Sequence, residues 1–183
     1  MHAIRAKGVA SPFGRIGRGG KDSSIAGETG AFSIPVRVYY EDSDAGGVVY
    51  YANYLKFMER ARTEWLRAGG FEQTALRNEY HVMFVVRSVA IEYLKPALFN
   101  DLLRITMQSI DVGRSRIGVR QAVLRPRQEL AGPDEVEVLA EAEIELVCVN
   151  SESFRPVRIP EVVREVLAAS VAEAGPGDTG HSD

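Results

Sequence analysis

The feature that most constrains the fold of this chain is a change in the spacing of its hydrophobic residues. Between residues 34 and 40 they recur at every second position, which is typical of a β-strand, and between 49 and 68 at every third or fourth, which is typical of an amphipathic helix. Period-two segments then follow at 81–93, 101–111, 114–125 and 136–149. This order predicts an α+β domain in which a helix covers one face of an antiparallel sheet.

Three details sharpen that prediction. The helix should end at Gly69 and Gly70, because glycine tolerates the left-handed conformation that closes many helices. A weaker helical turn is expected at 72–78, and Pro160 should occupy the first position of a closing helix. In the last strand the alternation buries one set of residues and turns the other set toward water. The buried set is Ala140, Ala142, Ile144, Leu146 and Cys148, and the water-facing set is Glu141, Glu143 and Glu145.

Length and composition indicate a single globular domain with loose ends. In a chain of 183 residues, 45% hydrophobic and 26% charged, we expect a flexible extension at 1–31, a domain at 32–172 and a flexible tail at 173–183. The loop between the last two strands should span 126–134. A net charge of −3 gives no electrostatic footprint for a nucleic-acid partner. One cysteine and no long apolar run predict a cytoplasmic protein without a membrane span.

The segment that carries chemistry is an acidic turn in front of the long helix. Asp42 and Asp44 lie in it, and Gly46 and Gly47 then allow a backbone to approach a ligand closely. The first N–H groups of the helix have no partners within the helix and can polarise a carbonyl oxygen opposite a carboxylate. That arrangement suits hydrolysis of an ester or thioester. An acidic turn that only caps the helix remains the alternative, and for Asp42 capping or bracing is the favoured role.

The segment YEDSDAGGVVYYANYLKFMERARTEWL, residues 40–66, resembles the signature of the 4-hydroxybenzoyl-CoA thioesterase family. It is closest to the bacterial branch of acyl-CoA thioesterases associated with the Tol-Pal system. The similarity continues through VRSVAIEYLKPALFNDLLRITMQSIDVGRSRIGV and SFRPVRIP. The resemblance implies a hotdog fold, which is a long helix wrapped by an antiparallel sheet. It also implies homodimers or homotetramers with active sites at the subunit interface.

Residue roles follow from the same resemblance. Asp44 matches the catalytic aspartate, and Tyr51 matches the position whose backbone N–H holds the thioester oxygen. The Tol-Pal branch usually has histidine there, but a main-chain donor does not depend on the side chain. The turn residues that would contact substrate are Gly46, Gly47 and Val48. The residues that would contact the CoA phosphates are Arg114, Ser115 and Arg116, for which a solvated strand end is an equal alternative.

The expected function is therefore hydrolysis of an acyl-CoA or acyl-carrier-protein thioester, with Asp44 as nucleophile or general base and no cofactor or metal. A noncatalytic thioester-binding adaptor of a cell-envelope complex and a hotdog hydratase or dehydratase are the alternatives. Cys148 is expected to pack in the core rather than to react. Glu59 is expected to form a helix-surface salt bridge with Arg60 or Arg62.

Overall fold

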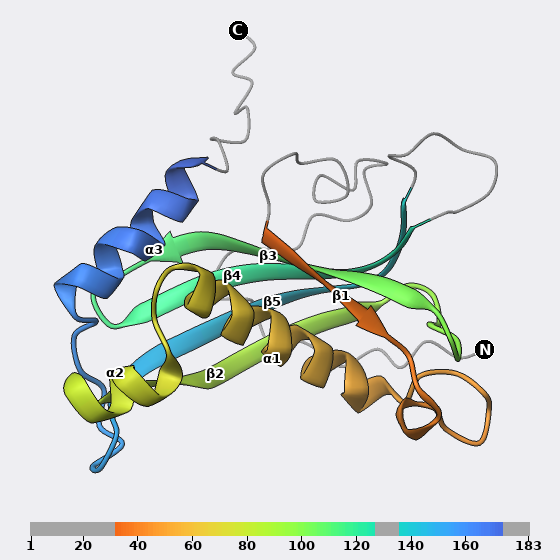
Figure 1. Ribbon diagram of the computed structural model, residues 1–183, viewed down its shortest axis with the longest axis horizontal. Coiled ribbons are helices and arrows are strands. Elements are labelled where there is room, and N and C mark those ends of the chain that lie inside the picture. The colour runs from red at the N-terminus through yellow and green to blue at the C-terminus, as the bar shows by residue number, and fades with distance from the viewer. Residues whose placement is uncertain (1–31, 127–135, 174–183) are drawn as a thin grey trace, which may run out of the picture.

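The computed structural model describes residues 32–126 and 136–173, and its elements follow the predicted order (Figure 1). A short 3-10 turn, η1, precedes the long helix. The strands are β1 (Phe32–Arg37), β2 (Val82–Tyr93), β3 (Leu102–Val112), β4 (Arg116–Pro126) and β5 (Val136–Asn150). The helical elements are η1 (Tyr40–Asp42), α1 (Tyr51–Ala68), α2 (Gln73–Glu79) and α3 (Glu161–Glu173).

The five strands form one sheet in the order β1-β3-β4-β5-β2, and every neighbouring pair is antiparallel. Helix α1 lies across one face of this sheet (Figure 1). The sheet wrapped on one helix confirms the predicted α+β hotdog architecture. Strand β2 is at an edge of the sheet, because β5 is its one neighbouring strand among the described residues.

Helix α1 forms where the 3.6-residue pattern predicted it, and its apolar side is the centre of the core. The buried residues of this side are Tyr54, Phe57, Met58, Ala61 and Leu66. The turn after the helix uses Gly70, whose φ of +89° is a conformation that favours glycine. Burial of apolar side chains between helix and sheet is the main source of stability in a domain of this kind.

Strand β5 confirms the predicted alternation but not the exposure of all three glutamates. Ala140, Ile144 and Cys148 are at most 1% exposed, as expected. Glu145, however, is only 3% exposed. Arg87 from β2 lies 2.5 Å from its carboxylate, and Arg116 from β4 lies 3.8 Å from it. The prediction that Glu145 faces water was wrong because side chains from two neighbouring strands can pair with a carboxylate on the polar face of a sheet.

Smaller differences concern the ends of elements and one ion pair. The closing helix begins at Glu161, so Pro160 precedes its first residue rather than occupying it. Glu59 accepts a hydrogen bond from the Thr63 hydroxyl at 3.0 Å, and within the described ranges it forms no salt bridge with Arg60 or Arg62. The proposed extension at 1–31 lies outside the described residues. So do the proposed tail at 173–183, apart from Glu173, and the proposed loop at 126–134, apart from Pro126. These two residues instead end α3 and β4.

Candidate active site

The turn that carries Asp44 is closed by hydrogen bonds of its own. The Asp44 N–H donates to the carbonyl of Val48 at 2.9 Å, and the Gly47 N–H donates to the carbonyl of Asp44 at 3.0 Å. The Gly46 N–H donates to Oδ1 of the Asp44 carboxylate at 2.7 Å. The carboxylate is therefore held by its own turn, and because Asp44 is exposed a ligand can reach it from solvent.

The geometry of this turn favours glycine at both of its glycine positions. A Cβ atom at position 46 would lie 3.0 Å from Oδ1 of Asp44, so any larger residue there must displace that carboxylate. Gly47 has a φ of +76°, which is strained for other residues. Val48, the third predicted contact residue, forms an isolated bridge with Leu98 and is partly buried. The structure thus brings Asp44, Gly46, Gly47 and Val48 together in one hydrogen-bonded turn.

Asp42 ties this turn to the beginning of α1. Its carbonyl accepts the N–H of Tyr50 at 2.9 Å and the side-chain amide of Asn53 at 2.9 Å. Its carboxylate accepts the N–H of Tyr39 at 2.9 Å. Asp42 and Asn53 are 7% and 5% exposed, so both bonds of the carbonyl are shielded from competing water. The prediction that Asp42 braces the turn is confirmed.

Tyr51 begins α1, and its backbone is fixed from the other side by β2. Among the described residues no side chain caps this end of the helix. The Tyr93 hydroxyl donates to the carbonyl of Tyr51 at 3.0 Å, and burial raises the pKa of this Tyr93 phenol, which keeps it protonated. The Tyr51 side chain is 60% exposed. An uncapped first turn beside an acidic loop is a suitable site for a developing negative charge.

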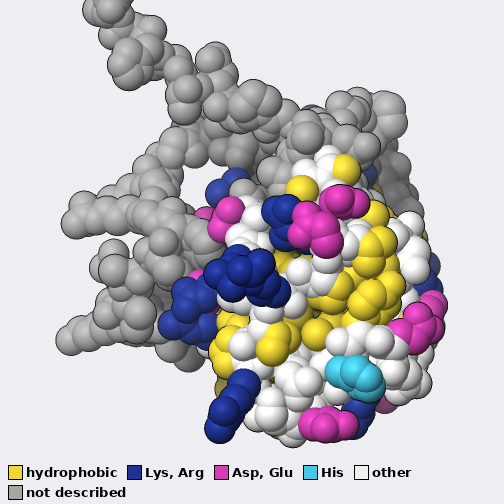
Figure 2. Space-filling view, turned by 90° about the vertical axis from the view of Figure 1, so that its left-hand side faces the viewer, with side chains coloured by type: hydrophobic (Ala, Val, Ile, Leu, Met, Phe, Trp, Pro, Cys, Tyr) yellow, Lys and Arg dark blue, Asp and Glu magenta, His cyan; other side chains and the backbone are white. Residues whose placement is uncertain are grey.

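The predicted phosphate contacts lie at the other end of the sheet. Arg116 of β4 pairs with a residue of β5 that in turn pairs with Val85 of β2. Val85 lies eight residues before Tyr93 along β2, which is about 26 Å at the usual rise of a strand. The turn that holds Arg114 and Ser115 and the turn that holds Asp44 occupy opposite ends in Figure 1. The end with the turn between β3 and β4 faces the viewer in Figure 2, where Lys and Arg side chains stand beside a hydrophobic patch. One copy of the chain therefore does not bring the two predicted groups together.

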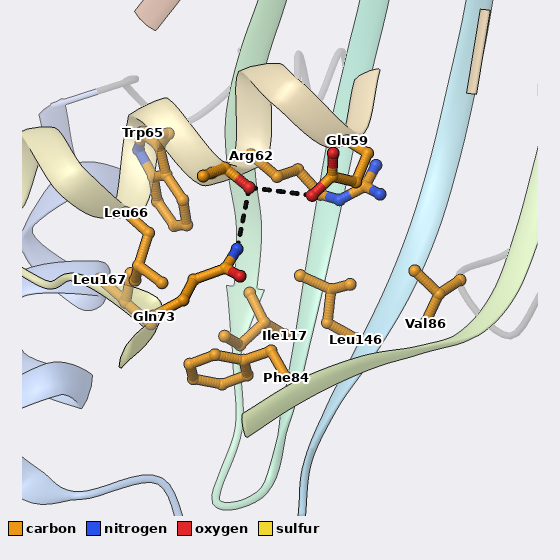
Figure 3. A pocket seen from close by; sticks show the side chains of 11 residues that line it. Glu59, Arg62, Trp65, Leu66, Gln73, Phe84, Val86, Ile117, Leu146 and Leu167 are labelled. Atoms are coloured by element: carbon orange, nitrogen blue, oxygen red, sulfur yellow. Dashed lines mark hydrogen bonds between the residues drawn. The ribbon is translucent and has the colours of Figure 1, made fainter. Parts of the chain in front are cut away.

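The structure also shows a cavity of about 110 Å³ under the C-terminal half of α1, which was not predicted (Figure 3). Its wall is mostly apolar and comes from α1, α2, α3, β2, β4 and β5. Among its lining residues are Glu59, Arg62, Leu66, Phe84, Val86 and Leu167. Burial lowers the pKa of the Arg62 guanidinium, which donates to Oε1 of Gln121 at 2.8 Å. No sequence signal marks this cavity, because its residues come from six separate elements.

Three further features of the described residues concern a buried thiol, metal ligands and the length of the helices. Burial raises the pKa of the Cys148 thiol to about 11, so it is protonated at neutral pH and is a poor nucleophile. The described ranges contain no group of three or more His, Cys, Asp or Glu residues that could hold a metal ion. None of the helices described is long and apolar enough to cross a membrane.

Comparison with known proteins gives the class. The family model of the thioesterase-like superfamily matches residues 38–167, which is most of the chain. This chain belongs to the thioesterase-like superfamily. Relatives of 34–42% identity that are named acyl-CoA thioesterases or thioester hydrolases confirm its predicted class, thioester hydrolase.

Among its relatives, the acyl-CoA thioesterase YbgC of Haemophilus influenzae is 41% identical over 133 residues, which cover 73% of this chain and 91% of that protein. A probable thioesterase from Bartonella henselae has a structure that aligns with a TM-score of 0.64 and 33% identity, over 71% of this chain and 99% of that one. A 4-hydroxybenzoyl-CoA thioesterase in complex with 4-hydroxybenzoyl-CoA aligns with a TM-score of 0.67 over 75% of this chain and 99% of that one. At 18% identity, it supports the fold alone.

Proposed function

We propose that this protein hydrolyses acyl-CoA thioesters at the turn between η1 and α1, with Asp44 as the catalytic carboxylate. The observation that carries the proposal is the link between this turn and the first residues of the helix through the Asp42 carbonyl. The link fixes the Asp44 turn relative to the uncapped helix end, and such fixed geometry is what positioning of a reacting thioester requires. The YbgC relatives support the same reaction by their names.

In the proposed mechanism the thioester carbonyl oxygen accepts the Tyr51 N–H. Ionised Asp44 then either attacks the carbonyl carbon or removes a proton from a water molecule that attacks it. The negative charge that develops on the oxygen is stabilised by the helix N-terminus, and collapse of the intermediate breaks the carbon–sulphur bond. The CoA thiolate leaves and takes up a proton. In the first route a water molecule then hydrolyses the acyl-aspartate anhydride. No metal or cofactor takes part in either route.

The remaining groups of the proposal bind the substrate. Gly46, Gly47 and Val48 present backbone to the pantetheine arm, and Arg114, Ser115 and Arg116 contact the CoA phosphates. One chain places these two groups near opposite ends of the sheet, with about 26 Å of β2 between the row of Arg116 and Tyr93. We therefore propose that the phosphate contacts come from a second copy. The open edge of β2 can pair with the same edge of another chain in a homodimer or homotetramer. The proposed substrate is the acyl thioester of CoA or of an acyl carrier protein, in the cytoplasm.

The test measures free thiol released from acyl-CoA esters by the wild type, by Asp44→Asn and by the matched control Glu41→Gln. Glu41 is an exposed carboxylate of the same turn region outside the proposed site. We expect release by wild type and control but not by Asp44→Asn. Ligand-induced stabilisation without thiol release from any ester would instead identify a binding adaptor. Hydration of a crotonyl ester without thiol release would identify a hydratase.

A further inference from the structure

The cavity under α1 is closed on the side of α3 and open on the side of β2. Leu167 of α3 and Leu66 of α1 are 2% and 7% exposed, whereas Val86 of β2 is 48% exposed. In Figure 3, Leu66 and Leu167 lie on one side of the cavity, and Glu59 and Val86 lie on the opposite side. A ligand would therefore enter along β2 and end against α3.

A row of apolar side chains on β2 connects the candidate active site with this cavity. The row consists of Tyr93, Ile91, Val89, Val86 and Phe84. Each is paired with a residue of β5 that faces the core, so the row lies on the α1 side of the sheet. Tyr93, at one end, donates to the carbonyl of Tyr51, and Phe84, at the other end, lines the cavity. Val89 and Tyr93 are 38% and 42% exposed, so a ligand can reach the row.

Distance and volume together restrict the group that could use this path. Glu59 is the lining residue of α1 nearest to Tyr51, and eight residues of helix separate them by about 12 Å. A single aromatic ring joined directly to the thioester is too short to span that distance. The cavity volume of about 110 Å³ is also smaller than the roughly 150 Å³ of an apolar cavity known to accept benzene. An extended aliphatic chain satisfies both limits.

The polar side chains of the lining already have partners. The Arg62 guanidinium donates to Gln121, the Thr63 hydroxyl donates to Glu59, and the Gln73 amide donates to Thr63 at 2.8 Å. A ligand therefore need not supply hydrogen bonds to them. What remains of the lining is apolar surface, whose burial favours binding of methylene groups in proportion to their number.

Resting on the proposed function, we infer that this cavity receives the far end of an unbranched aliphatic acyl chain whose thioester lies at the start of α1. Val86 at the open side and Leu167 at the closed side determine the length of chain that fits. The substrate class is thus a medium or long aliphatic acyl thioester rather than an aryl or short acyl one.

The test compares kcat/KM for butanoyl-, octanoyl-, dodecanoyl- and benzoyl-CoA. The wild type should prefer the octanoyl or dodecanoyl ester to the benzoyl and butanoyl esters by about tenfold or more. Val86→Phe, at a half-exposed site that tolerates a larger side chain, should lower the ratio of octanoyl to butanoyl activity by about tenfold. The matched control is Val85→Phe, because Val85 is adjacent on the same strand, points to the other face and does not line the cavity. It should leave that ratio unchanged.

Leu167→Val enlarges the closed end with a small loss of packing, and it should move the preferred substrate toward dodecanoyl-CoA. Melting temperatures of all variants check that they are folded. A benzoyl or butanoyl ester as the best substrate, or ratios that both cavity variants leave unchanged, would overturn the inference while thiol release still supports the proposed function. Absence of thiol release from every ester would instead refute the proposed function.

Discussion

The two ends of helix α1 are built differently. At its N-terminal end the important groups are exposed and held by local hydrogen bonds, as in Asp44 with its own turn and Asp42 with Asn53. At its C-terminal end Leu66 faces a cavity formed by residues from six elements. The difference teaches that a short continuous segment places the proposed catalytic groups, whereas the whole fold places the proposed acyl pocket. Substitutions at the first end should change turnover, and those at the second should change stability and selectivity.

The largest effect is expected from Asp44→Asn. Asparagine keeps a side-chain oxygen that can accept the Gly46 N–H, so the turn should persist, but it cannot act as base or nucleophile. We expect kcat to fall by about 100-fold or more and the free energy of unfolding to change by less than about 0.5 kcal/mol. Thiol release and chemical denaturation measure the two quantities. A large loss of unfolding free energy together with the loss of kcat would mean that Asp44 is a structural residue.

Leu66→Ala should produce the opposite pattern at the other end of the helix. This side chain is 7% exposed and borders the cavity, so its truncation removes buried apolar contacts and enlarges the cavity. The free energy of unfolding should fall by about 2–5 kcal/mol. Val162→Ala, at a position 46% exposed on α3, is the control and should cost far less. A loss of kcat as severe as that of Asp44→Asn, in a folded Leu66→Ala protein, would remove the contrast between the two ends.

Asn53→Ala should lower both kcat and the free energy of unfolding, because the Asn53 amide links the turn to the helix. The buried bond to the Asp42 carbonyl is lost while the Tyr50 N–H still donates to the same oxygen. We expect a loss of about 1–3 kcal/mol in stability and a fall in kcat larger than any change in KM. The exposed Asn78→Ala is the matched control. If kcat and KM both stay at wild-type values, this link does not position the turn.

The smallest effect concerns pH. Burial raises the pKa of Cys148 from its ordinary value of 9.0 to about 11, so the folded state holds this proton more tightly than the unfolded state. The resulting stability is fully present below pH 9 and is lost as the pH rises toward 11. Cys148→Ala lacks this pH-dependent contribution to stability. The difference in unfolding free energy between wild type and Cys148→Ala should therefore shift against the wild type over that range. A constant difference would contradict the assignment.

Sequence reasoning succeeded where the determining interactions are local. The period of hydrophobic residues predicted α1 and the strands, and the spacing of Asp42, Asp44 and the two glycines predicted the turn. It failed where side chains from distant segments meet. Glu145 is buried because Arg87, distant in the sequence, reaches its carboxylate. The cavity wall and the separation of Arg116 from Asp44 likewise depend on strand order, which hydrophobic periodicity does not specify.

The most direct test of the central claim is a structure of the protein with a CoA analogue in which a methylene replaces the thioester sulphur, so that the carbonyl cannot be hydrolysed. The account predicts that the carbonyl oxygen lies about 3 Å from the Tyr51 nitrogen, with the Asp44 carboxylate beside the carbonyl carbon. A carbonyl group bound away from the start of α1, or an Asp44 carboxylate on the side remote from it, would contradict the account.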